Sequence, residues 1–178
     1  MDEIALHILD LAVNAVSAGA RRVTIAVTED LAQDRLVVRV ADDGKGMDAQ
    51  HLDAVVERFA SEKTGRRRPI ALGLALLRQT AEQCGGEMRV ESAPGQGTQV
   101  EVWMRHGHIN RPPLGRRDET IFALCLGAPG VAVEFTHCRN GTVTHFDSAA
   151  VCQQLGPGAS LQSPEGIRAV REALESKR

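Results

Sequence analysis

The chain has 178 residues, 43% of them hydrophobic and only 3% aromatic, which is enough for one domain, or a domain with an appendage, around an aliphatic core. Its formal net charge of −2 disfavours nucleic acid as the main partner. The sequence contains no apolar run that would span a bilayer and no signal peptide, so we expect a cytoplasmic protein without membrane contact.

The cysteines and histidines are scattered along the chain. The cysteines form no C-x-x-C pair, and we expect all of them to be reduced thiols. His106 lies close to His108 and His137 adjoins Cys138, but no second pair at ligand spacing completes a tetrahedral site. We therefore interpret the histidines as placed by chance rather than as a zinc site.

Residues 4–18 predict a helix that is apolar over most of its circumference. Its polar side chains recur at spacings that place them above one another on one face: Glu3, His7, Asp10, Asn14 and Ser17. Most of them are short, whereas a solvated face usually carries Lys, Glu and Arg. Two interpretations stay open here, a face turned toward a specific ligand or a partly buried helix with one wet edge.

The middle of the chain predicts strands alternating with helices. In chain order, the patterns indicate antiparallel strands over 21–29 and 34–42, a helix over 47–60, a basic loop over 61–69 and an apolar helix over 70–86. Two further strands, 87–92 and 98–104, are joined by a hairpin turn rich in Gly and Pro.

Residues 105–119 form a polar connection with two adjacent prolines, which we interpret as a boundary. Beyond it the patterns favour strands over 120–126, 131–138 and 142–146, followed by a short helix over 147–156 and a terminal helix from Ser163. These strands either extend the main sheet or form a small separate domain for a partner.

The strand over 34–42 ends in the run Asp-x-Gly-x-Gly at residues 42–46. An ordinary turn needs one glycine, seldom two so close to a pair of acids. An acidic surface turn and a strand end that admits a ligand are equally compatible with these residues alone. The neighbouring motifs decide between them.

Four motifs follow one another in a definite order: "DLAVNAVSAGA", "DDGKGM", "IALGLALL" and "GQGT". Together they resemble the Bergerat-fold (GHKL) ATP-binding domain of histidine kinases, DNA gyrase B subunits, mismatch-repair ATPases and anti-sigma serine kinases, over about residues 4–104. The resemblance implies an α+β fold, a two-layer sandwich with a mixed sheet and helices on one face, plus a small C-terminal β/α extension. The domain organisation that we expect is an ATP-binding domain over 1–104, a linker over 105–119 and an extension over 120–178.

The resemblance also implies roles for individual residues toward Mg²⁺ and ATP. Asn14 matches the amide that holds Mg²⁺, Asp42 matches the carboxylate that accepts from the adenine amino group, and Asp10 matches the position of a general base. Lys63, in the stretch before the mobile lid, is placed to meet the terminal phosphates. The remaining implied nucleotide contacts are Ala18, Gly44, Gly46, Met47, Leu72, Gly73, Leu74, Gly97 and Thr98.

The sequence departs from the family pattern at two places. Asp10 stands where many members carry glutamate, which is one methylene longer, so we expect ATP hydrolysis to be slow or absent. Pro69 and Ala71 stand where the family favours glycines. The arginines at 66–68 either clamp phosphates or belong to a solvated basic loop.

From these motifs we expect a stand-alone regulatory module in signal transduction that binds Mg·ATP. It would hydrolyse ATP or transfer its γ-phosphate to a partner protein, as a histidine or serine kinase-like phosphotransferase does. Little chain precedes the first motif, so we expect the phosphoacceptor on another protein. The alternatives are a nucleotide sensor without catalysis and a dimeric ATP-gated clamp, for which residues 105–178 offer too short a transducer.

Overall fold

The computed structural model describes residues 3–50, 52, 54 and 72–175. Most of the helix predicted over 47–60 and all of the loop predicted over 61–69 lie outside the described residues. None of the helices in the described ranges has the length and apolar character needed to cross a membrane.

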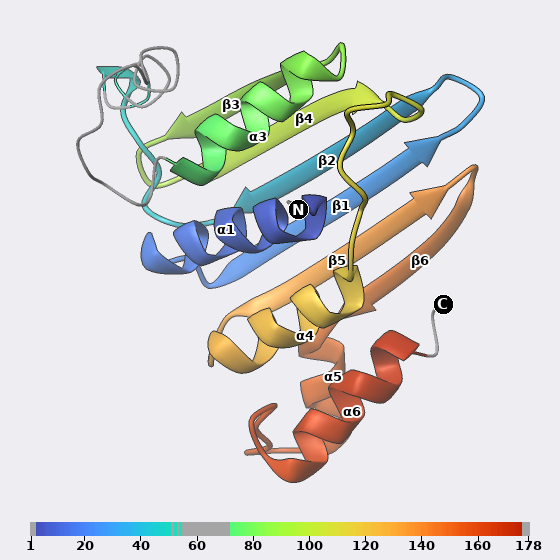
Figure 1. Ribbon diagram of the computed structural model, residues 1–178. Helices are drawn as coiled ribbons and strands as arrows, with labels where there is room; N and C mark the ends of the chain where they lie inside the picture. The colour runs from blue at the N-terminus through green and yellow to red at the C-terminus, as the bar shows by residue number, and fades with distance from the viewer. Residues whose placement is uncertain (1–2, 51, 53, 55–71, 176–178) are drawn as a thin grey trace.

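A six-stranded mixed sheet forms one layer of the molecule (Figure 1). Its strand order is β3-β4-β2-β1-β5-β6, and every neighbouring pair is antiparallel except β1 and β5, which are parallel. The strands are β1 (Arg22–Asp30), β2 (Arg35–Asp42), β3 (Glu87–Ala93), β4 (Gly97–Arg105), β5 (Ala132–Arg139) and β6 (Thr142–Asp147).

Helices form the second layer. Three of them cover one face of the sheet, namely α1 (Ile4–Ser17), α3 (Leu72–Gln83) and α4 (Arg117–Gly127) (Figure 1). The last two, α5 (Ser148–Leu155) and α6 (Pro164–Glu175), pack against each other beyond β5 and α4. The predicted α+β fold with a mixed sheet and helices on one face is therefore confirmed.

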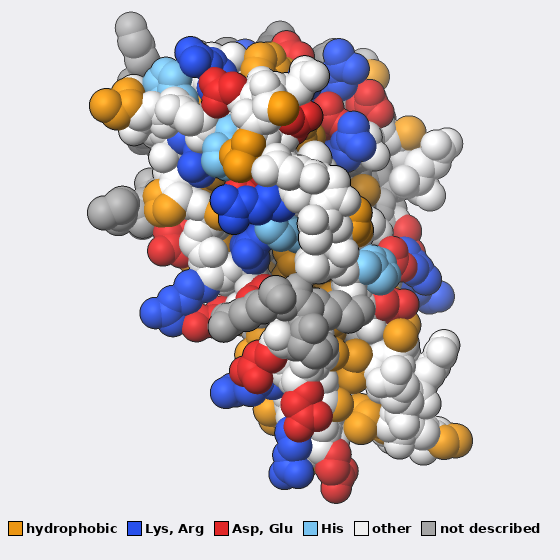
Figure 2. Space-filling view, turned by 90° about the vertical axis from the view of Figure 1, so that its right-hand side faces the viewer, with side chains coloured by type: hydrophobic (Ala, Val, Ile, Leu, Met, Phe, Trp, Pro, Cys, Tyr) orange, Lys and Arg blue, Asp and Glu red, His pale blue; other side chains and the backbone are white. Residues whose placement is uncertain are grey.

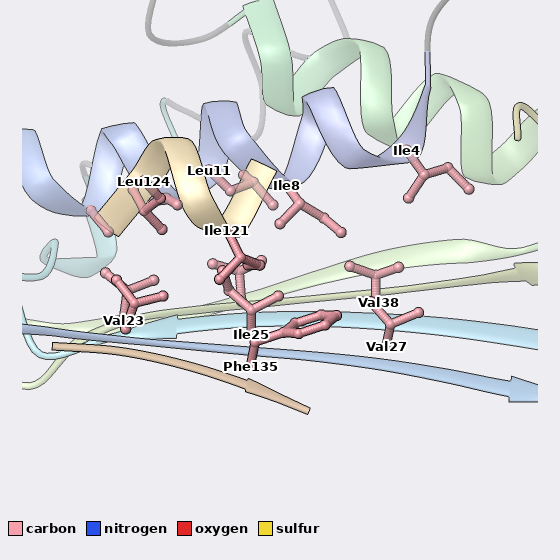
Figure 3. Close-up of a cluster of buried hydrophobic side chains, with 14 of the residues drawn as sticks. Ile4, Ile8, Leu11, Val23, Ile25, Val27, Val38, Ile121, Leu124 and Phe135 are labelled. Atoms are coloured by element: carbon pink, nitrogen blue, oxygen red, sulfur yellow. The ribbon is translucent and has the colours of Figure 1, made fainter. Parts of the chain in front are cut away.

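The core lies between the helices and the sheet (Figure 3). Val23, Ile25 and Val27 of β1 are fully buried because alternate residues of a strand point to the same face. Ile4 and Ile8 of α1 face them one turn apart. The same cluster continues without a break into α4, β5 and α6.

The strands after residue 119 extend the main sheet, which answers the question that the sequence left open. β5 pairs with β1 along its whole length, from Arg22 opposite Ala132 to Glu29 opposite Arg139. Its hairpin with β6 turns at Asn140 and Gly141, both with positive φ, as the Asn-Gly sequence predicts.

The strand predicted over 120–126 is wrong, because these residues belong to helix α4. Its buried residues, Thr120, Ile121, Leu124 and Cys125, lie on one helical face against α1 and β5. A short continuous apolar run fits a buried strand and a buried helix equally well, so periodicity could not decide between them.

The segment predicted as a linker caps helix α1. The side chain of Glu3 makes no cap hydrogen bond. The first N–H groups of the helix instead donate to residues that are distant in sequence. Ile4 N donates to Pro113 O at 3.0 Å, and Ala5 N donates to Leu114 O at 2.9 Å. The start of α1 therefore depends on a segment more than a hundred residues away in sequence.

Candidate functional site

Asp10 lies on the exposed side of α1, against the first turn of α3. A Cβ added to Gly73 would come within 3.0 Å of Asp10 Oδ2 and 3.1 Å of Asp10 Cβ. Such contacts are tighter than most Cβ atoms make, so a side chain at position 73 would require Asp10 to shift by a few tenths of an ångström. The first and third sequence motifs therefore meet at Asp10 and Gly73.

The C-terminal end of α1 contacts the turn that follows β2. Ala18 N donates to Asn14 O at 2.9 Å, and Ala18 O accepts a hydrogen bond from Lys45 N at 3.1 Å. A Cβ on Gly44 would lie 3.1 Å from Ala18 O and 2.8 Å from Asp42 Oδ1. Asn14 and Asp42 are thus joined through Ala18 and Gly44 on the same side of the molecule.

Asp42 ends β2 as a half-buried carboxylate opposite Thr98 of β4. Burial raises the pKa of Asp42 above its ordinary value of 3.8, although hydrogen bonds from the backbone N–H groups of Gly44 and Thr98 offset part of that rise. The bond from Gly44 N to Asp42 Oδ1 is 2.8 Å long. An ionised carboxylate accepts about four hydrogen bonds, so this group retains capacity for a donor from a ligand.

The two glycine turns touch each other through their backbones. Gly46 has a φ of +63°, and a Cβ there would lie 1.9 Å from Ala93 O. Gly97 has a φ of +79°, and a Cβ there would lie 1.8 Å from Asp42 O. At both positions the backbone has a left-handed conformation, and a Cβ atom would collide with a backbone oxygen of the other turn. The second and fourth motifs therefore meet at the end of β2.

Ser92, at the end of β3, is a residue of this site that the sequence analysis missed. Its Oγ accepts a hydrogen bond from Met47 N and donates one to Gly97 O, both at 2.9 Å. Thr98 Oγ1 lies at the same distance from it. Ser92 carried no sequence signal, because a serine near a strand end is ordinary.

The structure places the other predicted site residues as follows. Met47 and Thr98 are half-buried beside Ser92. Leu74 is buried in the core, and Leu72 begins α3. Lys63, like the arginines at 66–68 and Pro69 and Ala71, lies outside the described residues.

A second polar cluster lies toward the opposite end of the strands, around the buried Glu29 of β1. His106 Nε2 lies 2.8 Å from Glu29 Oε2, and His137 Nε2 lies 2.7 Å from Glu29 Oε1. Arg117 Nη1 lies 2.6 Å from His137 Nδ1. Figure 2 shows this end of the molecule, where histidines lie among basic and acidic side chains. Spacing in the sequence could not reveal that two scattered histidines meet one carboxylate.

The imidazole of His137 lies between a guanidinium and a carboxylate. Arg117 Nη1 lies 2.6 Å from His137 Nδ1 and 2.9 Å from His137 Nε2, and Nε2 also lies 2.7 Å from Glu29 Oε1. In the part of the chain that the structure describes, no group of three or more His, Cys, Asp or Glu side chains is arranged to hold a metal ion. The cluster therefore joins β1, β5, α4 and the chain after β4 as a hydrogen-bonded network.

A two-layer α+β sandwich in which one glycine turn meets the first helix and a second glycine turn meets the end of β2 is the arrangement of a Bergerat-type ATP-binding domain. Residues 1–108 match the family described as histidine kinase-, DNA gyrase B-, and HSP90-like ATPase, and the chain belongs to this family.

Sensor histidine kinases are among the relatives of the chain. It is 33% identical over 104 residues to the sensor histidine kinase ZraS of Salmonella typhimurium, covering 58% of this chain and 22% of that protein. It is 41% identical over 98 residues to ZraS of Klebsiella oxytoca, covering 54% and 20%. The chain thus spans about a fifth of the length of these relatives.

Two other comparisons cover nearly the whole chain. The autoinducer 2 sensor kinase/phosphatase LuxQ of Vibrio cholerae is 26% identical over 181 residues, covering 97% of this chain and 20% of that protein. The solved structure of the Aquifex aeolicus MutL ATPase domain, complexed with ADP, superposes with a TM-score of 0.49 at 18% identity. The superposition covers 99% of this chain and 70% of the MutL chain.

Proposed function

We propose that the chain binds Mg·ATP across the end of α1, the Asp42 turn and the β3–β4 turn, and acts as a regulatory phosphotransferase module. The observation that carries this proposal is the convergence of four motifs. Asp10 meets Gly73, Ala18 meets Gly44 and Lys45, and the Asp42 turn meets Gly97. A nucleotide needs protein groups for its base, its sugar and its phosphates at one place. The contacts between the four motifs bring such groups together.

The base end of the proposed site is formed by Asp42 and Thr98. The Asp42 carboxylate accepts a hydrogen bond from the exocyclic amino group of adenine, and the backbone N–H group of Gly44, which donates to Asp42 Oδ1, holds that carboxylate in place. Gly46 and Gly97 leave the neighbouring backbone without side chains, so the flat base can lie close to the two turns.

The phosphate end is formed by Asn14 and Asp10, one helical turn apart on α1. The Asn14 amide oxygen is a hard ligand of the kind that Mg²⁺ takes, and Mg²⁺ fills its remaining positions with phosphate oxygens and water. A single amide donor therefore suits an ion that arrives with the nucleotide. When bound, that ion would neutralise phosphate charge.

The proposed reaction moves the γ-phosphoryl group from ATP to a nucleophile on a partner protein. The new bond forms between phosphorus and the acceptor atom, the bond to the β-phosphate oxygen breaks, and ADP leaves. Asp10 takes the proton that the acceptor releases. Sensor histidine kinases among the relatives support a protein as the acceptor.

Thermal unfolding with Mg·ATP, Mg·ADP, Mg·GTP and no ligand tests the binding step, because a ligand stabilises the state that it binds. We expect ATP and ADP to raise the melting temperature and GTP to leave it unchanged. Equal shifts with all three nucleotides, or no shift with any, would contradict the proposal. Phosphate release from radiolabelled ATP, compared between the parent and Asp10→Asn, tests the role of Asp10.

A nucleotide sensor without catalysis is the second candidate. The observation that favours it is the aspartate at position 10, which is one methylene shorter than the glutamate of many family members. A sensor would show adenine-nucleotide stabilisation but neither phosphate release nor a labelled partner. A dimeric clamp would instead double its mass in light scattering when Mg·ATP is added.

A further inference from the structure

The Oγ atom of Ser92 makes three polar contacts, each 2.9 Å long, to the two turns of the proposed base site. Its partners are Met47 N, Gly97 O and Thr98 Oγ1. A serine hydroxyl has one hydrogen to donate and two lone pairs to accept with. These three contacts therefore use its whole hydrogen-bonding capacity.

The assignment of hydrogens in this network follows from the partners. Met47 N can only donate and Gly97 O can only accept, so Ser92 accepts from the first and donates its single hydrogen to the second. The contact between Ser92 Oγ and Thr98 Oγ1 is then a hydrogen bond only if Thr98 donates its hydroxyl hydrogen to Ser92. The opposite arrangement would leave two oxygen acceptors in contact without a hydrogen between them.

The consequence for Thr98 is a hydroxyl with no hydrogen left to offer a ligand. Its remaining lone-pair capacity makes it an acceptor. Asp42, opposite it on β2, is also an acceptor when ionised. Two acceptors side by side suit a base that presents an amino group and oppose one that presents a carbonyl oxygen.

We propose that Ser92 is a positioning residue that turns Thr98 into an acceptor and so makes the site selective for 6-amino over 6-oxo purine nucleotides. This inference rests on the proposed function, because it concerns the base end of the same site. Ser92 does not touch the nucleotide itself in this account. It acts through the hydroxyl of Thr98 and holds the backbone of Met47 beside it.

The probes are ATP and inosine triphosphate, whose purine carries an oxo group at the position of the adenine amino group. We expect the parent to bind ATP at least about tenfold more tightly, since a buried hydrogen-bonding group facing the wrong partner is costly. In Ser92→Ala, Thr98 is free to donate, so the ratio of the two dissociation constants should fall by about threefold to tenfold. Ser92→Thr keeps the hydroxyl and should therefore keep the parental ratio of the two dissociation constants.

Thr98→Val provides the test that does not touch Ser92. It removes the hydroxyl that Ser92 orients while Met47 N and Gly97 O keep their partner. The ratio should fall as far as in Ser92→Ala, and the two substitutions combined should lower it no further. Calorimetric titration gives the constants, and far-UV circular dichroism checks that each variant is folded.

The outcomes separate this inference from the proposed function. A parent that binds neither nucleotide contradicts the proposed function. A parent that binds ATP and inosine triphosphate equally, or a folded Ser92→Ala or Thr98→Val variant with the parental ratio, overturns the inference and leaves ATP binding in place. Should Ser92→Ala not fold, Thr98→Val and Ser92→Thr decide the question by the same ratio.

Discussion

Asp42 and Thr98 lie opposite each other on the adjacent strands β2 and β4. Asp42 and Thr98 are paired because β4, which follows α3 and β3 in the chain, lies between β3 and β2 in the sheet. The crossing brings the two glycine turns into backbone contact at the same end of the sheet. A carboxylate and a hydroxyl that are far apart in sequence thereby form one polar edge beside the first helix.

Asn14→Ala should weaken the magnesium-dependent part of ATP binding by at least about tenfold, because it removes the amide oxygen proposed as the ion's ligand. Binding of ATP in the presence of a chelator should change little. Isothermal titration with and without Mg²⁺ measures both quantities.

The matched control for Asn14 is Ser17→Ala on the same polar stripe of α1. Ser17 Oγ donates to Val13 O within its own helix at 2.9 Å, so its loss should leave both constants unchanged. If Asn14→Ala weakened ATP binding equally with and without the ion, Asn14 would be structural and not a ligand.

Gly97→Ala should destabilise the fold far more than Gly95→Ala in the same turn. Both glycines have a positive φ, which costs an alanine about 1–2 kcal/mol. A Cβ at position 95 meets nothing within 4 Å, whereas one at position 97 would lie 1.8 Å from Asp42 O. Overpacking therefore adds about 1–3 kcal/mol at position 97 only. Urea unfolding of both variants measures the difference, and equal losses would show that the turns are not in contact.

The Glu29 cluster should make the fold less stable as the pH falls below neutrality. Burial lowers the pKa of His137 below its ordinary 6.5, with the hydrogen bond to Glu29 offsetting part of the effect and the charge of Arg117 adding to it. The unfolded chain then binds the proton more readily. The stability from His137 is present above pH 6.5 and is lost as the pH falls through the lower, folded pKa.

Glu29 contributes in the same direction at lower pH. Burial acts to raise its pKa, but hydrogen bonds from His106 and His137 outweigh burial and the pKa lies below the ordinary 4.5. Its contribution is present above pH 4.5 and is lost in more acid solution. Urea unfolding between pH 7.5 and about 5 measures the His137 part. His137→Gln should flatten that slope, and His108→Gln, outside the cluster, should keep it; an unchanged slope in His137→Gln would contradict the assignment.

Phe135→Ala should destabilise the whole chain in one transition, by about 3–5 kcal/mol. Phe135 is buried on β5, in the same cluster as Ile25 of β1 (Figure 3). Trp103 of β4 reports on the other side of the sheet, where Arg35 lies 4.6 Å from its ring centre. Tryptophan fluorescence and far-UV circular dichroism should therefore move together. Separate transitions would show that residues after 119 fold as an independent unit.

The sequence predicted the strands of the sheet and helices α1 and α3 well, because their apolar periodicities are clear and glycines mark their ends. It also predicted the Asn140–Gly141 hairpin from turn chemistry alone. It failed at α4, where an unbroken apolar run carries no period. It could not foresee that Pro113 and Leu114 cap α1, because such a cap depends on tertiary contact and not on the residue before the helix.

The candidate site was predicted in part for a similar reason. Glycines that are required by a positive φ and a close backbone contact, such as Gly46 and Gly97, can be recognised in the sequence. A carboxylate at a strand end can be recognised as well. Ser92 leaves none, since its importance arises from three contacts that form only when the two turns meet. The pairing of His106 and His137 on Glu29 is likewise a product of strand order.

The most direct test of the account is a calorimetric titration of Asp42→Asn and Asp43→Asn with a non-hydrolysable ATP analogue and Mg²⁺. The two carboxylates are neighbours, but Asp43 accepts from Arg21 N and Arg22 N, at 2.7 and 2.8 Å, and is not assigned to the base. We predict that Asp42→Asn weakens binding by about tenfold to a hundredfold, as the loss of a charged hydrogen-bond acceptor implies, while Asp43→Asn stays near the parental affinity. Parental affinity in a folded Asp42→Asn variant would contradict the assignment of this strand end to the adenine.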